Sequence, residues 1–121
     1  MDNHISDIDL EIIKYLYNLK SGQTITTYSL AKKIFGKGAY GVAENKREYI
    51  NNKTKYIDYR MLILNKIGII DIAKLNGKKI YTLILNNVYF KKIKYKKLGI
   101  NEEAVFLKEG NGWNIYFYHE L

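Results

Sequence analysis

The chain has 121 residues, no cysteine and no proline, and its 20 basic and 12 acidic side chains give a formal net charge of +8. A chain of this length with 47% apolar residues can bury a core without a disulfide or a structural metal. We therefore expect a single domain over residues 1–121. Thiolate metal sites and thiol nucleophiles are excluded, and His4 and His119 lie at opposite ends of the chain, so we expect no cofactor.

Membrane and export signals are not visible in the sequence. No apolar run approaches the roughly 20 residues that span a bilayer, and the first residues lack the layout of a signal peptide. We expect an intracellular protein of the cytoplasm or nucleoid, in a host cell if the protein is viral, with no membrane partner.

The charge is segregated along the chain. Residues 32–100 hold 17 basic and 4 acidic side chains, whereas residues 1–31 and 101–121 are both net acidic. A one-sided positive field attracts polyanions, and nucleic-acid phosphates are the commonest partner of this kind. The alternative is a lysine-rich composition spread over a solvated surface, which does not account for the segregation.

Two helices are predicted in the first third of the chain. The first covers residues 6–19, because Ser6 is a suitable N-cap, carboxylates follow in the first turn and apolar residues recur at helical spacing. The second covers residues 28–35, with Thr26 or Thr27 as its N-cap. Each is followed by a glycine that favours a helix stop.

A third helix is predicted over residues 54–67, with Thr54 as its N-cap. Its apolar side chains share one arc of about 120°. These are Ile57, Met61, Leu64 and Ile67. The preceding residues 37–53 are rich in glycine, asparagine and charge, and contain at most a short helix over residues 44–50.

The rest of the chain reads as antiparallel β-structure. The strongest signal is Asn76-Gly77 between two β-rich runs, which predicts a hairpin. Glu-Gly-Asn-Gly at residues 109–112 predicts another, with Trp113, Ile115 and Phe117 sharing one face of its second strand. The predicted strands are residues 23–25, 69–75, 78–85, 88–97, 104–108 and 113–118.

The order of these elements carries a family resemblance. The segments TTYSLAKKIF (residues 26–35) and YRMLILNKIGII (residues 59–70) resemble the second and third helices of winged helix-turn-helix DNA-binding proteins, in the style of small archaeal and archaeal-virus members. The resemblance implies an α+β fold of three helices plus a β-hairpin wing over residues 6–85, followed by a C-terminal antiparallel β extension over residues 86–121. The segment 37–53 replaces the tight turn of a few residues that the family has between these helices.

In the winged-helix mode the third helix enters the major groove and the wing contacts the DNA backbone. The resemblance therefore implies that the outer face of the third helix supplies Thr54, Lys55, Asp58, Tyr59, Leu62 and Lys66. It implies a wing clamp on phosphate made of Lys74, Asn76, Lys78 and Lys79. It implies an anchor on the backbone from Thr27, Tyr28, Lys32 and Lys33. In the intervening segment, Arg47 is a better phosphate candidate than Arg60, and Lys53 is a further candidate DNA contact.

Two of these positions have competing interpretations. Leu62 either packs under residues 37–53 or meets a thymine methyl group. Arg60 lies within the apolar arc of the third helix, so it either pairs with Glu48 or Asp58 or binds phosphate.

The tyrosine-rich β region also has two interpretations. Tyr89, Tyr95, Tyr116 and Tyr118 beside the lysines of residues 91–97 form a stacking platform for single-stranded nucleic acid in one of them. In the other, aromatic residues at strand spacing belong to the core or to a dimer surface.

Catalysis is not expected. It requires a convergent set of titratable groups, whereas the carboxylates lie mostly toward the ends of the chain, and His119 beside Glu120 is interpreted as an exposed terminal histidine. We find no phosphate-binding glycine loop or hydrolase motif.

The leading functional hypothesis is a sequence-specific double-stranded DNA-binding protein, a transcriptional regulator acting as a homodimer through its first helix or its C-terminal sheet. Asp58, Tyr59 and Asn65 on the outer face of the third helix favour it. The alternatives are a non-specific architectural DNA-binding protein, favoured by the excess of lysine over arginine, and a protein-interaction adaptor on a winged-helix scaffold.

Overall fold

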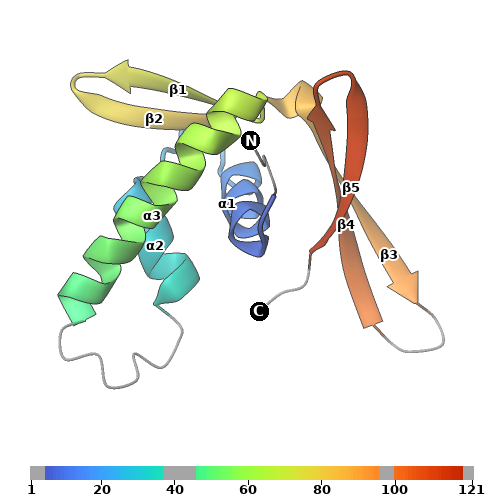
Figure 1. Ribbon diagram of the computed structural model, residues 1–121, viewed down its shortest axis with the longest axis horizontal. Helices are drawn as coiled ribbons and strands as arrows, with labels where there is room; N and C mark the ends of the chain where they lie inside the picture. The colour runs from blue at the N-terminus through green and yellow to red at the C-terminus, as the bar shows by residue number, and fades with distance from the viewer. Residues whose placement is uncertain (1–4, 37–45, 96–99, 119–121) are drawn as a thin grey trace.

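The computed structural model describes residues 5–36, 46–95 and 100–118, the side chains of residues 92–95 and 100–102 excepted. The described chain is α+β, with three helices and two small antiparallel sheets (Figure 1). The elements in order are α1 (Asp7–Tyr17), α2 (Thr27–Phe35), α3 (Lys46–Ile67), β1 (Ile70–Leu75), β2 (Lys78–Leu83), the 3-10 turn η1 (Leu85–Asn87), β3 (Val88–Tyr95), β4 (Ile100–Glu109) and β5 (Gly112–Tyr118).

Helix α1 begins where the sequence predicts. The Ser6 hydroxyl accepts a hydrogen bond from the Asp9 amide at 3.3 Å, and the Asp9 carboxylate accepts one from the Ser6 amide at 2.8 Å. This reciprocal capping box satisfies two amides that the first turn leaves without helical partners. The helix ends at Tyr17, two residues before the predicted Leu19, and the Leu19 amide donates to the Leu16 carbonyl oxygen at 3.3 Å, three residues back, in place of the helical bond to Tyr15.

Helix α2 also agrees with its prediction. Thr26 is its N-cap and accepts from the Ser29 amide at 3.1 Å. The predicted short strand over residues 23–25 is wrong, because these residues have no strand pairing and instead connect α1 to α2.

Helix α3 is longer than predicted, and the N-cap assigned to Thr54 is wrong. Thr54 lies inside the helix, where its hydroxyl donates to the Ile50 carbonyl oxygen at 2.8 Å. Ile50 is buried and extends the apolar face of Ile57, Met61 and Leu64 by two turns toward the N-terminus. Burial of that extra isoleucine favours helix over residues 46–53, although their local composition is polar.

The hairpin of β1 and β2 forms as predicted. Asn76 and Gly77 have φ values of 52° and 79°. Positive φ values at both positions are typical of the two-residue hairpin turn, whose twist matches that of paired antiparallel strands. The register sets Ile72 opposite Tyr81 at the base of the hairpin and Lys74 opposite Lys79 near its tip. The base therefore joins the core while the tip projects into solvent (Figure 1).

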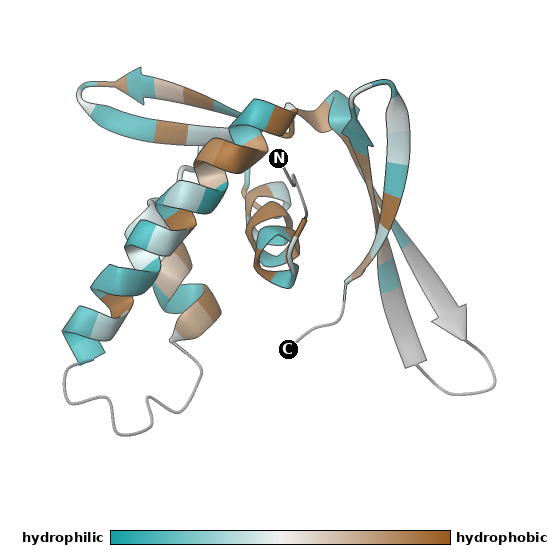
Figure 2. Ribbon diagram, in the orientation of Figure 1, coloured by the Kyte–Doolittle hydropathy of each residue, from teal (hydrophilic) through white to brown (hydrophobic). Residues whose placement is uncertain are grey.

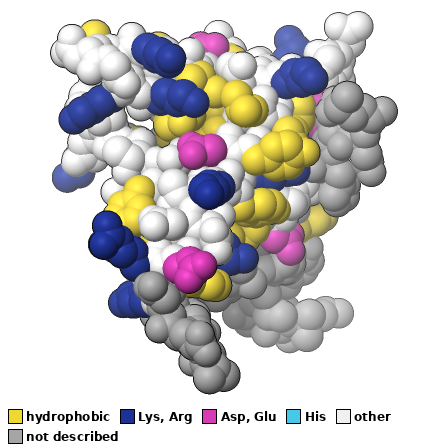
Figure 3. Space-filling model, turned by 60° about the vertical axis from the view of Figure 1, so that its left-hand side comes forward, with side chains coloured by type: hydrophobic (Ala, Val, Ile, Leu, Met, Phe, Trp, Pro, Cys, Tyr) yellow, Lys and Arg dark blue, Asp and Glu magenta, His cyan; other side chains and the backbone are white. Residues whose placement is uncertain are grey.

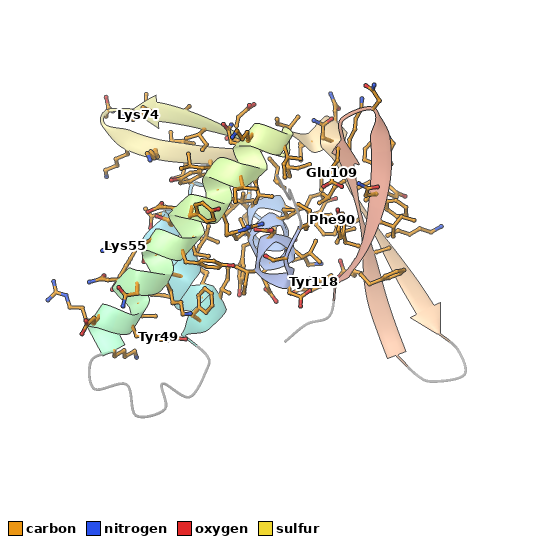
Figure 4. All side chains as sticks on the ribbon, in the orientation of Figure 1. Tyr49, Lys55, Lys74, Phe90, Glu109 and Tyr118 are labelled. Carbon is orange, nitrogen blue, oxygen red and sulfur yellow. The ribbon has the colours of Figure 1, made fainter. Side chains whose placement is uncertain are left out.

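The second sheet has the order β3-β4-β5, and one of its faces packs on α1. The rings of Tyr17 and Phe90 are 4.5 Å apart between centroids. Lys14 forms an ion pair with Glu103, and the Tyr118 hydroxyl donates to Glu11 Oε1 at 3.2 Å. Figure 4 shows Phe90 and Tyr118 between the sheet and α1.

One buried cluster joins helices and sheets. It includes Ile12 of α1, Leu30 of α2, Met61 of α3 and Leu107 of β4, each fully buried. Figure 2 shows the apolar residues of α1 at the centre of this arrangement. Residues of the predicted C-terminal extension therefore share the core of the helices and do not form a separate one.

None of the helices in the described ranges is long and apolar enough to cross a membrane.

Candidate nucleic-acid interface

The face of α3 opposite the core carries a stripe of exposed side chains. Lys55, Tyr59, Leu62 and Lys66 follow one another at spacings of four, three and four residues, and all are exposed. Side chains at this spacing lie on one side of a helix. We call these four residues the α3 stripe. Tyr59 is 58% and Leu62 56% exposed, so two large apolar groups lie in water between two lysines.

Two other predicted base-contacting residues lie beside the stripe and are half-buried. Thr54 donates to the Ile50 carbonyl, as described above. Asp58 faces the hairpin, where it accepts a hydrogen bond from the Tyr81 hydroxyl at 3.4 Å. Burial, assisted by the charge of Asp58, raises the pKa of Tyr81 above its ordinary value. Asp58 therefore connects α3 to the hairpin, whereas the hydrogen bond of Thr54 lies within α3 itself.

Asn65 has a comparable structural role. Its side-chain amide donates to the Ile70 carbonyl oxygen at 2.9 Å and ties the end of α3 to the start of β1. Of the three side chains that favoured base reading on sequence grounds, Tyr59 is the one that projects from the α3 stripe.

The hairpin tip is basic. Lys74 and Lys79 are paired directly across the two strands, Lys78 follows the turn, and all three are exposed with Asn76. Like charges directly opposite each other on a hairpin disfavour the pairing. An anion held between them removes that penalty, so this pair suits a phosphate group. Figure 4 shows Lys55 and Lys74 on the same side of the molecule, away from the β3-β4-β5 sheet.

A hollow of about 640 Å³ lies between α2 and the beginning of α3. Tyr28, Lys32 and Arg47, all predicted contacts, line it together with Lys46. The Lys32 ammonium group lies 5.5 Å from the centre of the Tyr28 ring. Lys46 is the residue that the sequence reasoning missed, because the short helix allowed over residues 44–50 was not expected to join the third helix and so place Lys46 beside α2.

Two predicted lysine contacts turn toward aromatic rings of the fold. Lys53 lies 4.8 Å from the Phe35 ring centre and 5.4 Å from that of Tyr49, and it is half-buried between α2 and α3. Lys33 lies 5.9 Å from the ring centre of Tyr15 on α1. The contacts of Lys53 direct its ammonium group toward the protein, whereas Lys33 stays exposed beside the Tyr15 ring. The last predicted residue, Thr27, is half-buried at the start of α2.

Arg60 pairs with a carboxylate, but neither Glu48 nor Asp58 is the observed partner. Its Nε donates to Asp9 Oδ1 at 2.8 Å, and its Nη2 pairs with Asp9 Oδ2. The hydrogen bond to Asp9 raises the pKa of Arg60, against the opposing effect of burial. A helical wheel of α3 cannot reveal this partner, because Asp9 lies 51 residues earlier in the sequence.

The side of the molecule bearing α2, α3 and the hairpin is mostly basic. Figure 3 shows Lys and Arg side chains distributed over this side, with apolar groups between them and a few carboxylates. The described α3 stripe and hairpin tip contribute five of the predicted lysines. The arrangement combines exposed cations with exposed apolar groups, and these are the two kinds of side chain by which proteins contact the DNA backbone and base edges respectively.

The tyrosine platform predicted for the β region is not assembled as expected. Tyr116 and Tyr118 lie on the face of the sheet that packs on α1, whereas Tyr89 lies on the opposite face, as the cross-strand register requires. Burial and a 2.8 Å hydrogen bond to Glu109 raise the pKa of Tyr116 to about 12. The side chain of Tyr95 is outside the described part.

Within residues 5–36, 46–95 and 100–118 no three His, Asp or Glu side chains are grouped closely enough to hold a metal ion. The described residues do not include His4, His119 or residues 37–45. The prediction that Leu62 packs under residues 37–53 therefore falls partly outside the described residues. Comparisons of the chain with protein-family models, with curated proteins and with solved structures find no match.

Proposed function

We propose that this protein is a winged helix-turn-helix, sequence-specific double-stranded DNA-binding protein that acts as a homodimeric transcriptional regulator. In this proposal α3 enters the major groove with the α3 stripe facing the bases, and the β1-β2 hairpin is the wing on the backbone. The observation that carries it is the α3 stripe itself, in which Tyr59 and Leu62 are exposed between Lys55 and Lys66 on the face opposite the core.

The position of the hairpin supports the same proposal. The hydrogen bond between Tyr81 and Asp58 joins the base of the hairpin to the middle of α3. The tip lysines then extend the positive surface beyond the helix, as a wing does when it contacts phosphates beside the groove. Tyr28, Lys32 and Arg47 around the α2 hollow provide a further phosphate contact on the other side.

A second candidate is an architectural protein that binds DNA by charge with little base reading. The specific observation in its favour is that one of the two arginines of the chain is paired inside the fold. Arg60 is committed to Asp9, which leaves Arg47 as the arginine near the surface, and arginine is the commonest reader of guanine. If the protein instead binds specific sequences, the exposed apolar groups of the α3 stripe suit thymine-rich sites, which are read by contact with the thymine methyl group.

The two candidates are separated by binding titrations against a random duplex and against the region upstream of the protein's own gene, at two salt concentrations. We expect at least about a hundredfold preference for the specific duplex, which persists as salt weakens both complexes. A preference below about tenfold supports the architectural candidate. Absence of binding to any duplex at low salt contradicts both and leaves the adaptor.

A further inference from the structure

The outer face of the β3-β4-β5 sheet is an apolar surface that nothing in the described chain covers. The cross-strand register aligns Tyr89, Phe106 and Ile115 in one row over the three strands. Trp113 and Phe117 flank Ile115 on the same side of β5. Tyr89, Trp113, Ile115 and Phe117 are each 47–57% exposed, which is unusual for aromatic and aliphatic groups at strand spacing. We call these five residues the outer sheet face.

This face points away from the proposed DNA-binding surface. The other side of the sheet packs on α1 through the contacts of Phe90 and Tyr118. Figure 1 shows α3 and the hairpin on one side of α1 and the three-stranded sheet on the other. A partner bound to the outer sheet face therefore leaves the α3 stripe and the hairpin tip uncovered.

The face includes an open depression of about 410 Å³ bounded by Leu85, Tyr89, Phe106 and Trp113, next to Ile115 and Phe117 on β5. A two-fold interface uses the same patch on both partners, so it requires a surface complementary to itself. An open, gently hollowed apolar patch meets that requirement, because two copies of it can be laid face to face.

The exposed apolar area matches what a dimer needs. An aromatic side chain buries about 150–250 Å² when it is fully covered, so the half-exposed groups of this face, with Leu85, expose about 500 Å². That is near the upper limit for a monomer. A stable interface buries about 800 Å² per partner, of which somewhat more than half is apolar.

The aliphatic members of the face favour a protein partner over a stacked nucleic acid. Ile115 lies at the edge of the central row and Leu85 borders the depression, and neither aliphatic side chain offers a ring for a base. Two described lysines lie at the margins of the outer sheet face: Lys91 on the edge strand β3 and Lys108 next to the β4-β5 turn. At these positions their ammonium groups stay hydrated in a dimer.

We infer that the outer sheet face is a two-fold interface with a second copy of this chain. The inference rests on the proposed function only for the use of the dimer on DNA, where two α3 helices meet two half-sites. The self-association itself rests on the exposed apolar area, the open shape of the face and the position of the sheet.

Sedimentation equilibrium without DNA tests the interface directly. We expect wild-type protein to be a dimer at micromolar concentration, and Ile115→Lys to raise the dissociation constant by at least about thirtyfold, because it buries an unpaired charge between apolar groups of the interface. Leu75→Lys, at an equally exposed apolar position of the hairpin, is the matched control and should sediment as wild type. The inference is overturned if wild-type protein is still monomeric at a concentration of about 100 μM. It is also overturned if Ile115→Lys remains as dimeric as wild type.

Trp113 provides a second measurement that needs no substitution, because it is the single tryptophan of the chain. Its emission should shift to longer wavelength as the protein is diluted below the dissociation constant, since the indole becomes exposed. Emission that responds to oligothymidylate and not to protein concentration overturns the inference in favour of a stacking surface.

The two proposals fail in different ways. A dimer that binds no duplex contradicts the proposed function and leaves this interface standing. A monomer that binds duplex specifically contradicts the interface and the homodimeric state, and leaves the proposed DNA binding standing. If both hold, Ile115→Lys should keep its affinity for a single half-site and lose the additional affinity of wild type for a palindrome.

Discussion

The guanidinium group of Arg60 holds the buried carboxylate of Asp9 with two hydrogen bonds and so connects α3 to the first turn of α1. Asp9 is fully buried, and it also accepts from the Ser6 amide in the capping box. One carboxylate therefore caps the N-terminus of α1 and also holds α3, the helix that we propose for base reading. The orientation of the α3 stripe relative to the rest of the protein depends on this pair.

Arg60→Met should destabilise the fold by about 3–5 kcal/mol, because it leaves an unpaired buried carboxylate. Urea unfolding followed by circular dichroism measures the loss. The double variant Asp9→Asn with Arg60→Met keeps an acceptor for the Ser6 amide and removes the buried charge, so it should regain most of the stability. A loss below about 1 kcal/mol in the single variant would show that the pair behaves as a surface ion pair.

Lys78→Ala combined with Lys79→Ala should weaken binding to all duplexes alike. The slope of log binding constant against log salt should decrease by about 2, because two phosphate contacts no longer release counterions. Lys91→Ala combined with Lys108→Ala changes the net charge equally on the far sheet and is the control. Equal slopes for the two double variants would remove the hairpin from the interface.

Leu62→Ala should remove a preference for thymine at particular positions of the site. The expected contact is with the thymine methyl group, so replacing thymine by uracil in the duplex should weaken wild-type binding and leave the variant unaffected. Competition titrations with singly substituted duplexes locate the position. If no uracil substitution affects the wild type, Leu62 does not read thymine.

Tyr59→Ala should alter base preference or phosphate contact at the middle of α3. A changed ranking of duplexes, with differences of about 1–3 kcal/mol at one or two base pairs, indicates base reading. A uniform loss across all duplexes indicates a phosphate contact instead. Thermal unfolding of the variant is the control, and it should match wild type because the side chain is mostly exposed.

Tyr116 should make the fold sensitive to alkaline pH. Because its folded-state pKa is raised to about 12, its contribution to stability is present below the ordinary tyrosine pKa of about 10 and is lost as the pH rises through 12. The difference in unfolding free energy between wild type and Tyr116→Phe should be constant up to about pH 9 and should narrow between pH 10 and 12. A difference independent of pH over that window would contradict the raised pKa.

The sequence by itself determined most of the local structure. Ser6 and Thr26 cap the helices that they were expected to cap, and Asn76-Gly77 makes the predicted hairpin turn. These outcomes depend on hydrogen bonds and backbone angles within a few residues, so local patterns suffice to predict them. The exposed positions of Lys55, Tyr59, Leu62 and Lys66 follow in the same way from helical periodicity.

The tertiary structure decided which polar and aromatic groups are committed to the fold. Asp58 bonds to Tyr81, Lys53 lies over Phe35 and Tyr49, and Arg60 reaches Asp9 across 51 residues. It also decided that Trp113, Ile115 and Phe117 face outward while Tyr116 and Tyr118 face α1. Periodicity shows which residues share a face, but the face that becomes buried depends on where distant elements pack, and that is set by the free energy of the assembled core.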